Sequence, residues 1–186
     1  MQHNKAQRTD NPSPLQQELL DALTSQDTML IHVKQPWAWA LVTGEKDVEN
    51  RTFKLKPTSG FPVWVPIVAS KSVPTNKDGE EMARRIYLQA GPDASVRSVK
   101  GKIPAKHEFV LDKIVGMVDV IGCYSEKEMP FESVWYNALD FGWVVGKAVK
   151  FSNSIDVDST DHFQTMVKLS NRPQYLPRLR EEIMKI

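Results

Sequence analysis

Apolar positions recur along the chain with two different periods, and these periods predict separate helices and strands. Near the amino terminus, four leucines follow helical spacing: Leu15, Leu19, Leu20 and Leu23. Ser13 and Gln16, on either side of Pro14, fit a capping box with proline at the first helical position. We therefore predict a helix over residues 14–25, after a polar lead that we expect to be flexible.

The rest of the chain shows the same two patterns. Helical spacing with matching start and stop residues predicts further helices over residues 36–43, 78–88, 131–139 and from 176 onwards. Short β-prone runs predict strands over residues 29–34, 47–53, 63–70, 109–120, 141–151 and 163–169. Pro66 indicates an edge strand or a bulge, and Gly116 indicates a bulge or a close backbone approach. The run at 141–151, which contains Gly142 and Gly146, is typical of a pair of strands.

These elements favour an α+β fold. Five or six strands and three or four helices besides the amino-terminal one, without regular alternation of strand and helix, indicate a small mixed β-barrel with flanking helices. We expect a flexible lead and amino-terminal helix over residues 1–28, the barrel domain over 29–170 and a carboxy-terminal helix over 171–186. The amino-terminal helix carries no candidate chemistry, so we interpret it as an appendage packed on the domain.

Residues 91–106 are rich in Gly, Pro, Ser and Lys, and we predict a long loop there. Long loops in compact domains are either functional or disordered. Together with Arg85, the basic residues of this stretch form either a rim that contacts phosphate or part of a solvated loop: Arg97, Lys100, Lys102 and Lys106.

Charge and hydropathy restrict the classes of function. The 186 residues carry 24 Lys and Arg against 23 Asp and Glu, so the net charge of +1 gives no global field that attracts a polyanion. Any nucleic-acid site must therefore be local. No apolar run approaches the ~18 residues that span a bilayer, and the polar start lacks the apolar segment of a secretory signal. We expect a cytoplasmic or nuclear protein that has no membrane contact.

Neither a metal nor a disulfide is indicated. Cys123 is the single cysteine, which excludes an intrachain disulfide, and its apolar neighbours indicate a buried, inert thiol. The four histidines lack the short spacing of zinc ligands: His3, His32, His107 and His162. We predict no metal site and no cofactor.

The most specific pattern is a set of charged residues after the second predicted helix. Gly44 ends that helix, which leaves Lys46 at a turn from which its long stem reaches over the mouth of the barrel. Glu49 and Arg51 then alternate onto one face of a strand. A lysine beside a carboxylate is either held charged, which suits phosphate or a base carbonyl, or desolvated and shifted towards a neutral base. The alternative is a surface network of ion pairs without function.

The segment HVKQPWAWALVTGEKDVENRTF, residues 32–53, resembles the motif of the ASCH family, a QPWA-type helix followed by a G-x-K-x-x-E-x-R turn and strand. Four positions match this motif one by one: Gly44, Lys46, Glu49 and Arg51. Weaker matches are VPIVASK at residues 65–71 and the two strands at 114–124 and 141–151. The resemblance covers about residues 29–169 and implies a PUA-like β-barrel.

The resemblance also implies a pocket. Trp37, Trp39 and Trp143 offer aromatic faces on which a splayed base stacks, with a place in the core as the alternative for each. Ser70 and Lys71 supply a hydroxyl and a second cation for the far wall. The predicted ligand-binding set is Gln35, Trp37, Trp39, Lys46, Glu49, Arg51, Ser70, Lys71 and Trp143.

Members of the ASCH family bind RNA, hydrolyse N4-acetylcytidine or cleave RNA, and the fold alone does not choose among them. Our first hypothesis is a domain that binds RNA or a modified nucleoside. The second is an amidohydrolase of N4-acylated cytidine, or a ribonuclease, in which Lys46 is the general base and Glu49 or another carboxylate shuttles protons. In the small amidohydrolase relatives the Glu49 position is a threonine thought to act as nucleophile, so that mechanism does not carry over unchanged.

A third hypothesis is a protein-interaction module, because ASCH domains also occur in transcription coactivators. Its signature would be exposed apolar faces on the two terminal helices.

Overall fold

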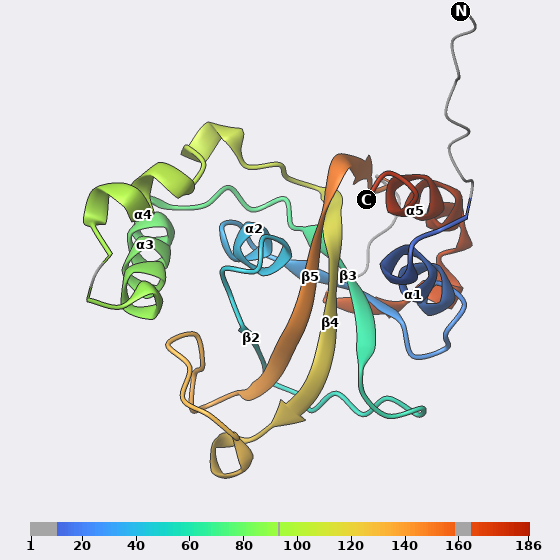
Figure 1. The fold of residues 1–186 in the computed structure, drawn as a ribbon, viewed down its shortest axis with the longest axis horizontal. Coiled ribbons are helices and arrows are strands. Elements are labelled where there is room, and N and C mark those ends of the chain that lie inside the picture. Colours follow the sequence, from blue (N-terminus) through green and yellow to red (C-terminus); the bar gives the residue numbers. More distant parts are fainter. Residues whose placement is uncertain (1–10, 93, 159–164) are drawn as a thin grey trace, which may run out of the picture.

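The computed structural model describes residues 11–92, 94–158 and 165–186, which are arranged around a six-stranded mixed sheet (Figure 1). The strands are β1 (Met29–Val33), β2 (Val48–Arg51), β3 (Val63–Ala69), β4 (Lys113–Tyr124), β5 (Phe141–Asp156) and β6 (Met166–Lys168). Their spatial order is β2-β5-β4-β3-β1-β6, with β1 and β3 parallel and the other neighbours antiparallel. The sheet curls into a half-barrel, so the predicted α+β fold with a small mixed barrel and flanking helices is confirmed.

Helices cover both faces of this sheet. They are α1 (Pro14–Ala22), α2 (Trp37–Val42), α3 (Asn76–Ala90), α4 (Val96–Lys102) and α5 (Leu176–Ile183). Figure 1 shows α3 and α4 at one end of the molecule, α1 and α5 at the other, and α2 beside the sheet. No helix in the described part of the chain has the length and apolar character needed to cross a membrane.

Strand β3 shows why the core has two layers. Its seven residues are all buried, because successive side chains point to opposite faces and both faces are covered. Val65 and Ile67 pack in the same cluster as Leu41 of α2. Trp64 and Val68 pack instead in the cluster that holds the leucines of α1 and the apolar residues of α5. The terminal helices therefore close one face of the sheet while α2 closes the other.

The predicted terminal helices are confirmed. Ser13 and Gln16 form the expected reciprocal capping box, and the start of α5 at Leu176 is where the apolar spacing placed it. The polar lead at residues 1–10 lies outside the described residues, as do residues 163 and 164 of the last predicted strand.

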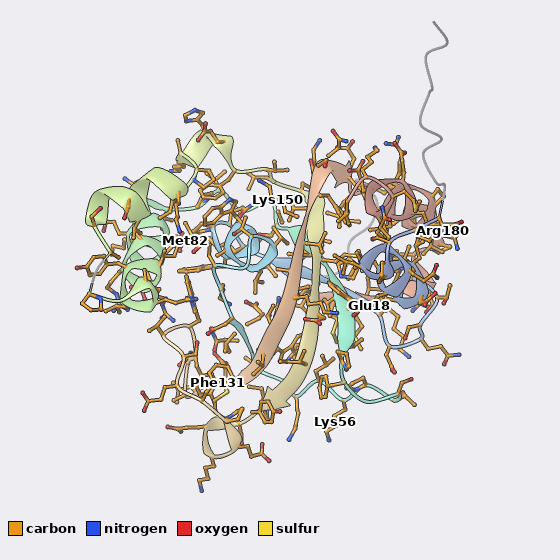
Figure 2. All side chains as sticks on the ribbon, in the orientation of Figure 1. Glu18, Lys56, Met82, Phe131, Lys150 and Arg180 are labelled. Atoms are coloured by element: carbon orange, nitrogen blue, oxygen red, sulfur yellow. The ribbon has the colours of Figure 1, made fainter. Side chains whose placement is uncertain are left out.

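The prediction of a long loop over residues 91–106 is wrong, because helix α4 lies within it. Ser95 caps this helix by accepting a hydrogen bond from the Ser98 amide at 3.0 Å. Val99 is buried against α3, in the same cluster as Met82, which lies on the side of α3 that faces α2 (Figure 2). Tertiary packing of one valine thus outweighs the weak helix propensity of a segment rich in Gly and Ser.

The predicted helix over residues 131–139 is also wrong, since this segment consists of turns. Asn50 explains the difference. Its side-chain amide donates to the Trp135 carbonyl at 2.7 Å and its oxygen accepts from the Asn137 amide at 2.7 Å. The side chain of Asn50, which lies in β2, therefore binds backbone groups that would pair with one another if residues 131–139 formed a helix.

Three glycine and proline signals have mixed outcomes. The expected pair of strands at 141–151 is a single strand, β5, whose pairing with β4 changes register on either side of Gly146. Strand β3 is not at an edge, but the bulge alternative for Pro66 is confirmed by a register shift between Ile67 and Val68. Gly116 lies at another shift, and a Cβ there would collide with the Val149 carbonyl.

Candidate functional site

The main candidate site is a pocket of about 490 Å³ where the two ends of the curled sheet approach each other. It lies between β1, β2, the start of α2, one face of α3 and the turns near residue 135. Its lining residues are His32, Val33, Lys34, Trp37, Lys46, Glu49, Asn50, Arg51, Glu81, Arg85, Trp135, Tyr136, Asn137 and Ala138. Volumes of this size are typical of small-molecule sites.

Three charged side chains form a continuous chain in this pocket. Lys46 Nζ donates to Glu49 Oε2 at 2.5 Å, and Arg51 Nη2 lies 3.1 Å from Glu49 Oε1. The side chains are only 5%, 11% and 12% exposed, respectively. This is a buried network rather than a surface one, and both carboxylate oxygens of Glu49 are engaged within it.

Burial controls the protonation of Lys46. Removal from water lowers the pKa of Lys46, and the nearby positive charges of Arg51 and Arg85 lower it further, while Glu49 opposes the shift. The direction is downwards, so the neutral amine is favoured more than in an exposed lysine. The sequence left two alternatives for Lys46, a lysine that is held charged and a lysine that is desolvated. The structure supports the desolvated lysine, with Glu49 as its single carboxylate partner.

Arg51 is held by the protein on two sides. Its guanidinium lies over the Trp143 ring at 5.9 Å from the ring centre, and Nη2 donates to the His32 carbonyl at 2.9 Å. The second contact joins β2 to β1 across the opening of the half-barrel. Arg51 Nε is buried and has no hydrogen-bond partner among the described residues.

Aromatic side chains form another wall. Trp37, at the start of α2, is half-buried and packs edge-to-face on Trp135, with ring centres 6.1 Å apart. Tyr136 comes from the same turns as Trp135 and anchors itself by donating its hydroxyl to the Asp140 carbonyl at 2.9 Å. The pocket therefore offers aromatic surface beside the charged network, which suits a flat heteroaromatic ring.

Helix α3 supplies the outer rim. Arg85 donates from Nε to Glu81 at 2.6 Å and from Nη1 to the Val134 carbonyl at 2.7 Å, which ties α3 to the turns. Glu81 also binds Arg84, and the hydrogen bond from Arg84 is the main reason that the pKa of Glu81 falls to about 2. Directly after β1, Lys34 pairs with Asp78 at 2.8 Å.

The structure brings four of the nine predicted ligand-binding residues into this pocket, namely Trp37, Lys46, Glu49 and Arg51. The other five lie elsewhere. Gln35 is 2% exposed and links the Val110 carbonyl to the Trp39 amide. Trp39 packs on Phe109 outside the pocket.

The other three residues of the predicted set are separated from the pocket in different ways. Trp143 is fully buried and reaches the pocket only through Arg51. Ser70 donates its backbone amide to the Val33 carbonyl, and neither it nor Lys71 lines the pocket. Lys71 is largely exposed, with Asp112 at 3.5 Å.

The sequence missed several lining residues, including His32, Lys34, Arg85, Trp135 and Tyr136. Arg85 was considered only for a phosphate-contacting rim with the basic residues at 97–106. The side chains of Arg97 and Lys100 are outside the description, and Lys102 pairs with Glu45 at 3.7 Å. A usable signal was the alternation in β1, which places His32 and Lys34 on one face.

Within the described ranges, no group of three or more His, Cys, Asp or Glu side chains is placed to hold a metal ion. Cys123 is buried, and burial raises the pKa of its thiol, which makes it a poor nucleophile.

Comparison with known proteins gives a likeness at the level of fold. No family model and no curated protein matches the chain. Among solved structures it is similar to ASCH from Zymomonas mobilis, with 12% identity and a TM-score of 0.48, covering 83% of this chain and 96% of that one. Two mutant forms of that protein give TM-scores of 0.44 and 0.45 at 12% and 11% identity, covering 82% and 81% of this chain and 97% and 98% of theirs. The names of these solved structures carry the same family name as the motif at residues 32–53.

Proposed function

We propose that the pocket binds one nucleoside unit, either a free nucleoside, which includes a modified one, or a single nucleotide of RNA. The observation that carries the proposal is the meeting of the buried Lys46–Glu49–Arg51 network with the aromatic wall at Trp37 in a space of about 490 Å³. A base needs an aromatic or apolar face for stacking and polar groups for its edge, and this pocket offers both.

The size and depth of the site favour a single unit. An extended RNA strand is normally bound along a basic groove with successive stacking platforms. Here the lining residues gather in one concave site, and the chain as a whole has a net charge of only +1. RNA would therefore enter through one base turned out of its strand.

An equilibrium screen tests the proposal. Purified protein is titrated at low salt with cytidine, uridine, adenosine, guanosine, N4-acetylcytidine and a short single-stranded RNA, followed by calorimetry. We expect at least one nucleoside to bind, with affinity that is lost in Lys46→Ala and kept in Lys150→Ala. Lys150 is an exposed lysine of β5 that does not line the pocket, so it controls for loss of charge (Figure 2). No binding of any of these compounds would overturn the proposal.

The Lys46–Glu49 pair also favours a second candidate, hydrolysis of an acylated base. The lowered pKa of Lys46 suits a general base, which would remove a proton from water as the oxygen attacks the acyl carbon. Lys46 then returns this proton to N4 of the base as the bond between N4 and the acyl carbon breaks, which releases the carboxylic acid and cytidine, while Glu49, 2.5 Å from the amine, holds Lys46 in place. Both oxygens of Glu49 are already engaged, by Lys46 and by Arg51. We therefore propose that Glu49 positions Lys46 and does not itself attack the acyl carbon.

Mass spectrometry of N4-acetylcytidine incubated with the protein tests this candidate. We expect release of acetate and cytidine, a strong loss of turnover in Glu49→Gln, and retained nucleoside binding in that variant. Equal turnover by Glu49→Gln would remove the proposed role, and intact substrate with wild-type protein would leave a binding domain.

The protein-interaction hypothesis gains no support from the terminal helices. Leu19 of α1 and Leu179 and Ile183 of α5 are fully buried against the sheet. Among the apolar residues near the end of the chain, Met184 and Ile186 are partly exposed, at 45% and 44%. These two residues form a much smaller surface than the apolar faces that the hypothesis required.

A further inference from the structure

Among the ionisable side chains that line the pocket, hydrogen-bond donors outnumber the acceptors that remain free for a ligand. The ionisable lining residues of the pocket are four basic side chains, Lys34, Lys46, Arg51 and Arg85, against the carboxylates Glu49 and Glu81. Glu49 is already shared between Lys46 and Arg51. Glu81 accepts from both Arg84 and Arg85. The lining carboxylates are thus occupied, so the capacity left for a ligand consists mainly of donors.

Two of these donors are held by one helix at the mouth of the pocket. Asp78, Glu81 and Arg85 are spaced by three and four residues, which places them on one face of α3. Asp78 pairs with Lys34 and Glu81 pairs with Arg85, so this helical face holds both cations in the rim of the same pocket. Lys34 keeps unused ammonium protons, and no described residue accepts a hydrogen bond from Nη2 of Arg85.

The depth of the two sets of cations differs. Lys46 and Arg51 are almost fully buried and sit where the base edge is proposed to lie, whereas the side chains of Lys34 and Arg85 are 40% and 24% exposed. A nucleotide has the same polarity, with an uncharged base at one end and an anionic phosphate at the other. Arginine and lysine at the solvent edge are the usual partners of phosphate.

We propose that the rim formed by Arg85 and Lys34 is a phosphate subsite, and that the pocket selects a nucleotide over the corresponding nucleoside. This inference rests on the proposed function, because the base has to occupy the inner pocket for the phosphate to reach the rim. The phosphate comes either from a free 5′-mononucleotide or from an RNA strand, and the chemistry at the rim is the same for both.

Calorimetry with matched pairs tests the subsite. Cytidine, uridine, adenosine and guanosine are each compared with their 5′-monophosphates in the wild-type protein, in Arg85→Met and in Arg84→Met. Arg84 is the matched control, because it neighbours Arg85 and binds the same Glu81 but does not line the pocket. The experiment compares, within each variant, the affinity for the 5′-monophosphate with the affinity for its nucleoside. A general loss of pocket structure weakens both affinities and leaves their ratio unchanged.

We expect the 5′-monophosphate to bind roughly tenfold more tightly than its nucleoside in the wild-type protein, the size expected for a charge-assisted hydrogen bond. The ratio should fall towards one in Arg85→Met, recover in Arg85→Lys, stay unchanged in Arg84→Met and decrease as KCl is added.

Failure of the phosphate subsite and failure of the nucleoside site would give different results. Equal binding of nucleoside and nucleotide, or equal loss of the ratio in the Arg84 and Arg85 variants, overturns the phosphate subsite and leaves the nucleoside site intact. Absence of binding by nucleosides and nucleotides alike overturns both proposals. A trinucleotide with the preferred base in the centre separates the two sources: binding comparable with that of the mononucleotide supports RNA, and weaker binding supports a free nucleotide.

Discussion

Two buried glutamates in this molecule each pair with a lysine, and the two pairs differ in how far the lysine is exposed. In the pocket, Glu49 lies 2.5 Å from Lys46, and where α5 packs on β5, Glu182 lies 2.7 Å from Lys185. Both carboxylates are almost inaccessible, with side chains 11% and 6% exposed. The lysines differ, because Lys185 is 38% exposed whereas Lys46 is 5% exposed.

The balance of forces differs accordingly. Burial acts to raise the pKa of Glu182, but hydrogen bonds from Lys185 and from Asn153 outweigh it, and the pKa is lowered. For Lys46 burial wins over the attraction of Glu49, and the pKa is lowered towards the neutral amine. The Glu182–Lys185 pair satisfies its charge and anchors α5, whereas the Lys46–Glu49 pair leaves a poorly solvated amine beside an open pocket. This difference is the reason that we assign a structural role to the pair at Glu182 and propose a ligand-binding role for the pair at Lys46.

The largest expected effect comes from Lys46→Met. Removing this amine should weaken nucleoside binding at least about 100-fold, because a hydrogen bond to a charged or strongly polar group in a desolvated site is lost. The free energy of unfolding of the Lys46→Met variant should change little, because Glu49 keeps Arg51 as a partner. Calorimetry and urea unfolding measure the two quantities, with Lys150→Met as the control. A variant that unfolds readily but still binds would reverse the assignment of the pair.

Next in size is Glu182→Ala, which should lower the free energy of unfolding by about 2–3 kcal/mol by leaving the Asn153 amide without its acceptor. Glu181→Ala is the matched control. Glu181 precedes Glu182, pairs with the same Lys185 and is 58% exposed, so its loss should change stability by less than about 0.5 kcal/mol. Urea unfolding measures both, and ligand binding should be unchanged in each. Equal effects of the two substitutions would contradict the structural role.

A smaller effect is expected in the pH dependence of stability. The ordinary pKa of Lys46, about 10.5, applies to the unfolded chain, and the folded value lies below it. Between the two values the unfolded state binds more protons, so stability rises with pH by up to about 1.4 kcal/mol per unit. The difference in unfolding free energy between wild type and Lys46→Met should therefore rise as the pH approaches 10.5 from below.

Lys150→Met is the control for this measurement, because Lys150 is exposed and does not line the pocket. A profile for Lys46→Met that does not change with pH would show that burial does not shift the pKa of this lysine, and the contrast with Glu182 would disappear.

The sequence predicted the inner part of the pocket because that part is local. Lys46, Glu49 and Arg51 lie within one turn and one strand, so chain geometry alone brings them together. The same holds for most helices and strands, whose apolar spacing was sufficient.

Apart from Trp37, the aromatic wall and the rim could not be predicted from the sequence, because they depend on contacts between distant segments. Arg85 reaches the pocket only because Met82 and Ile86 fix the face of α3 that points inwards. Trp135 lies in turns that Asn50, 85 residues away, holds by hydrogen bonds, and no local pattern specifies this. The basic loop failed as a prediction for the same reason, since α4 depends on the burial of Val99 against α3.

The smallest expected effect is that of Lys185→Met, and it sharpens the contrast between the pairs. Glu182 would lose one partner but keep the Asn153 backbone amide at 2.9 Å and the Asn153 side chain at 3.3 Å. Because Lys185 is 38% exposed, solvent already screens its charge, so the free energy of unfolding should fall only slightly, by less than in Glu182→Ala. Part of that loss should vanish below about pH 4, where the carboxylate is protonated in the unfolded chain. A loss as large as that of Glu182→Ala would mean that the lysine, rather than the backbone amide, holds α5 to the sheet.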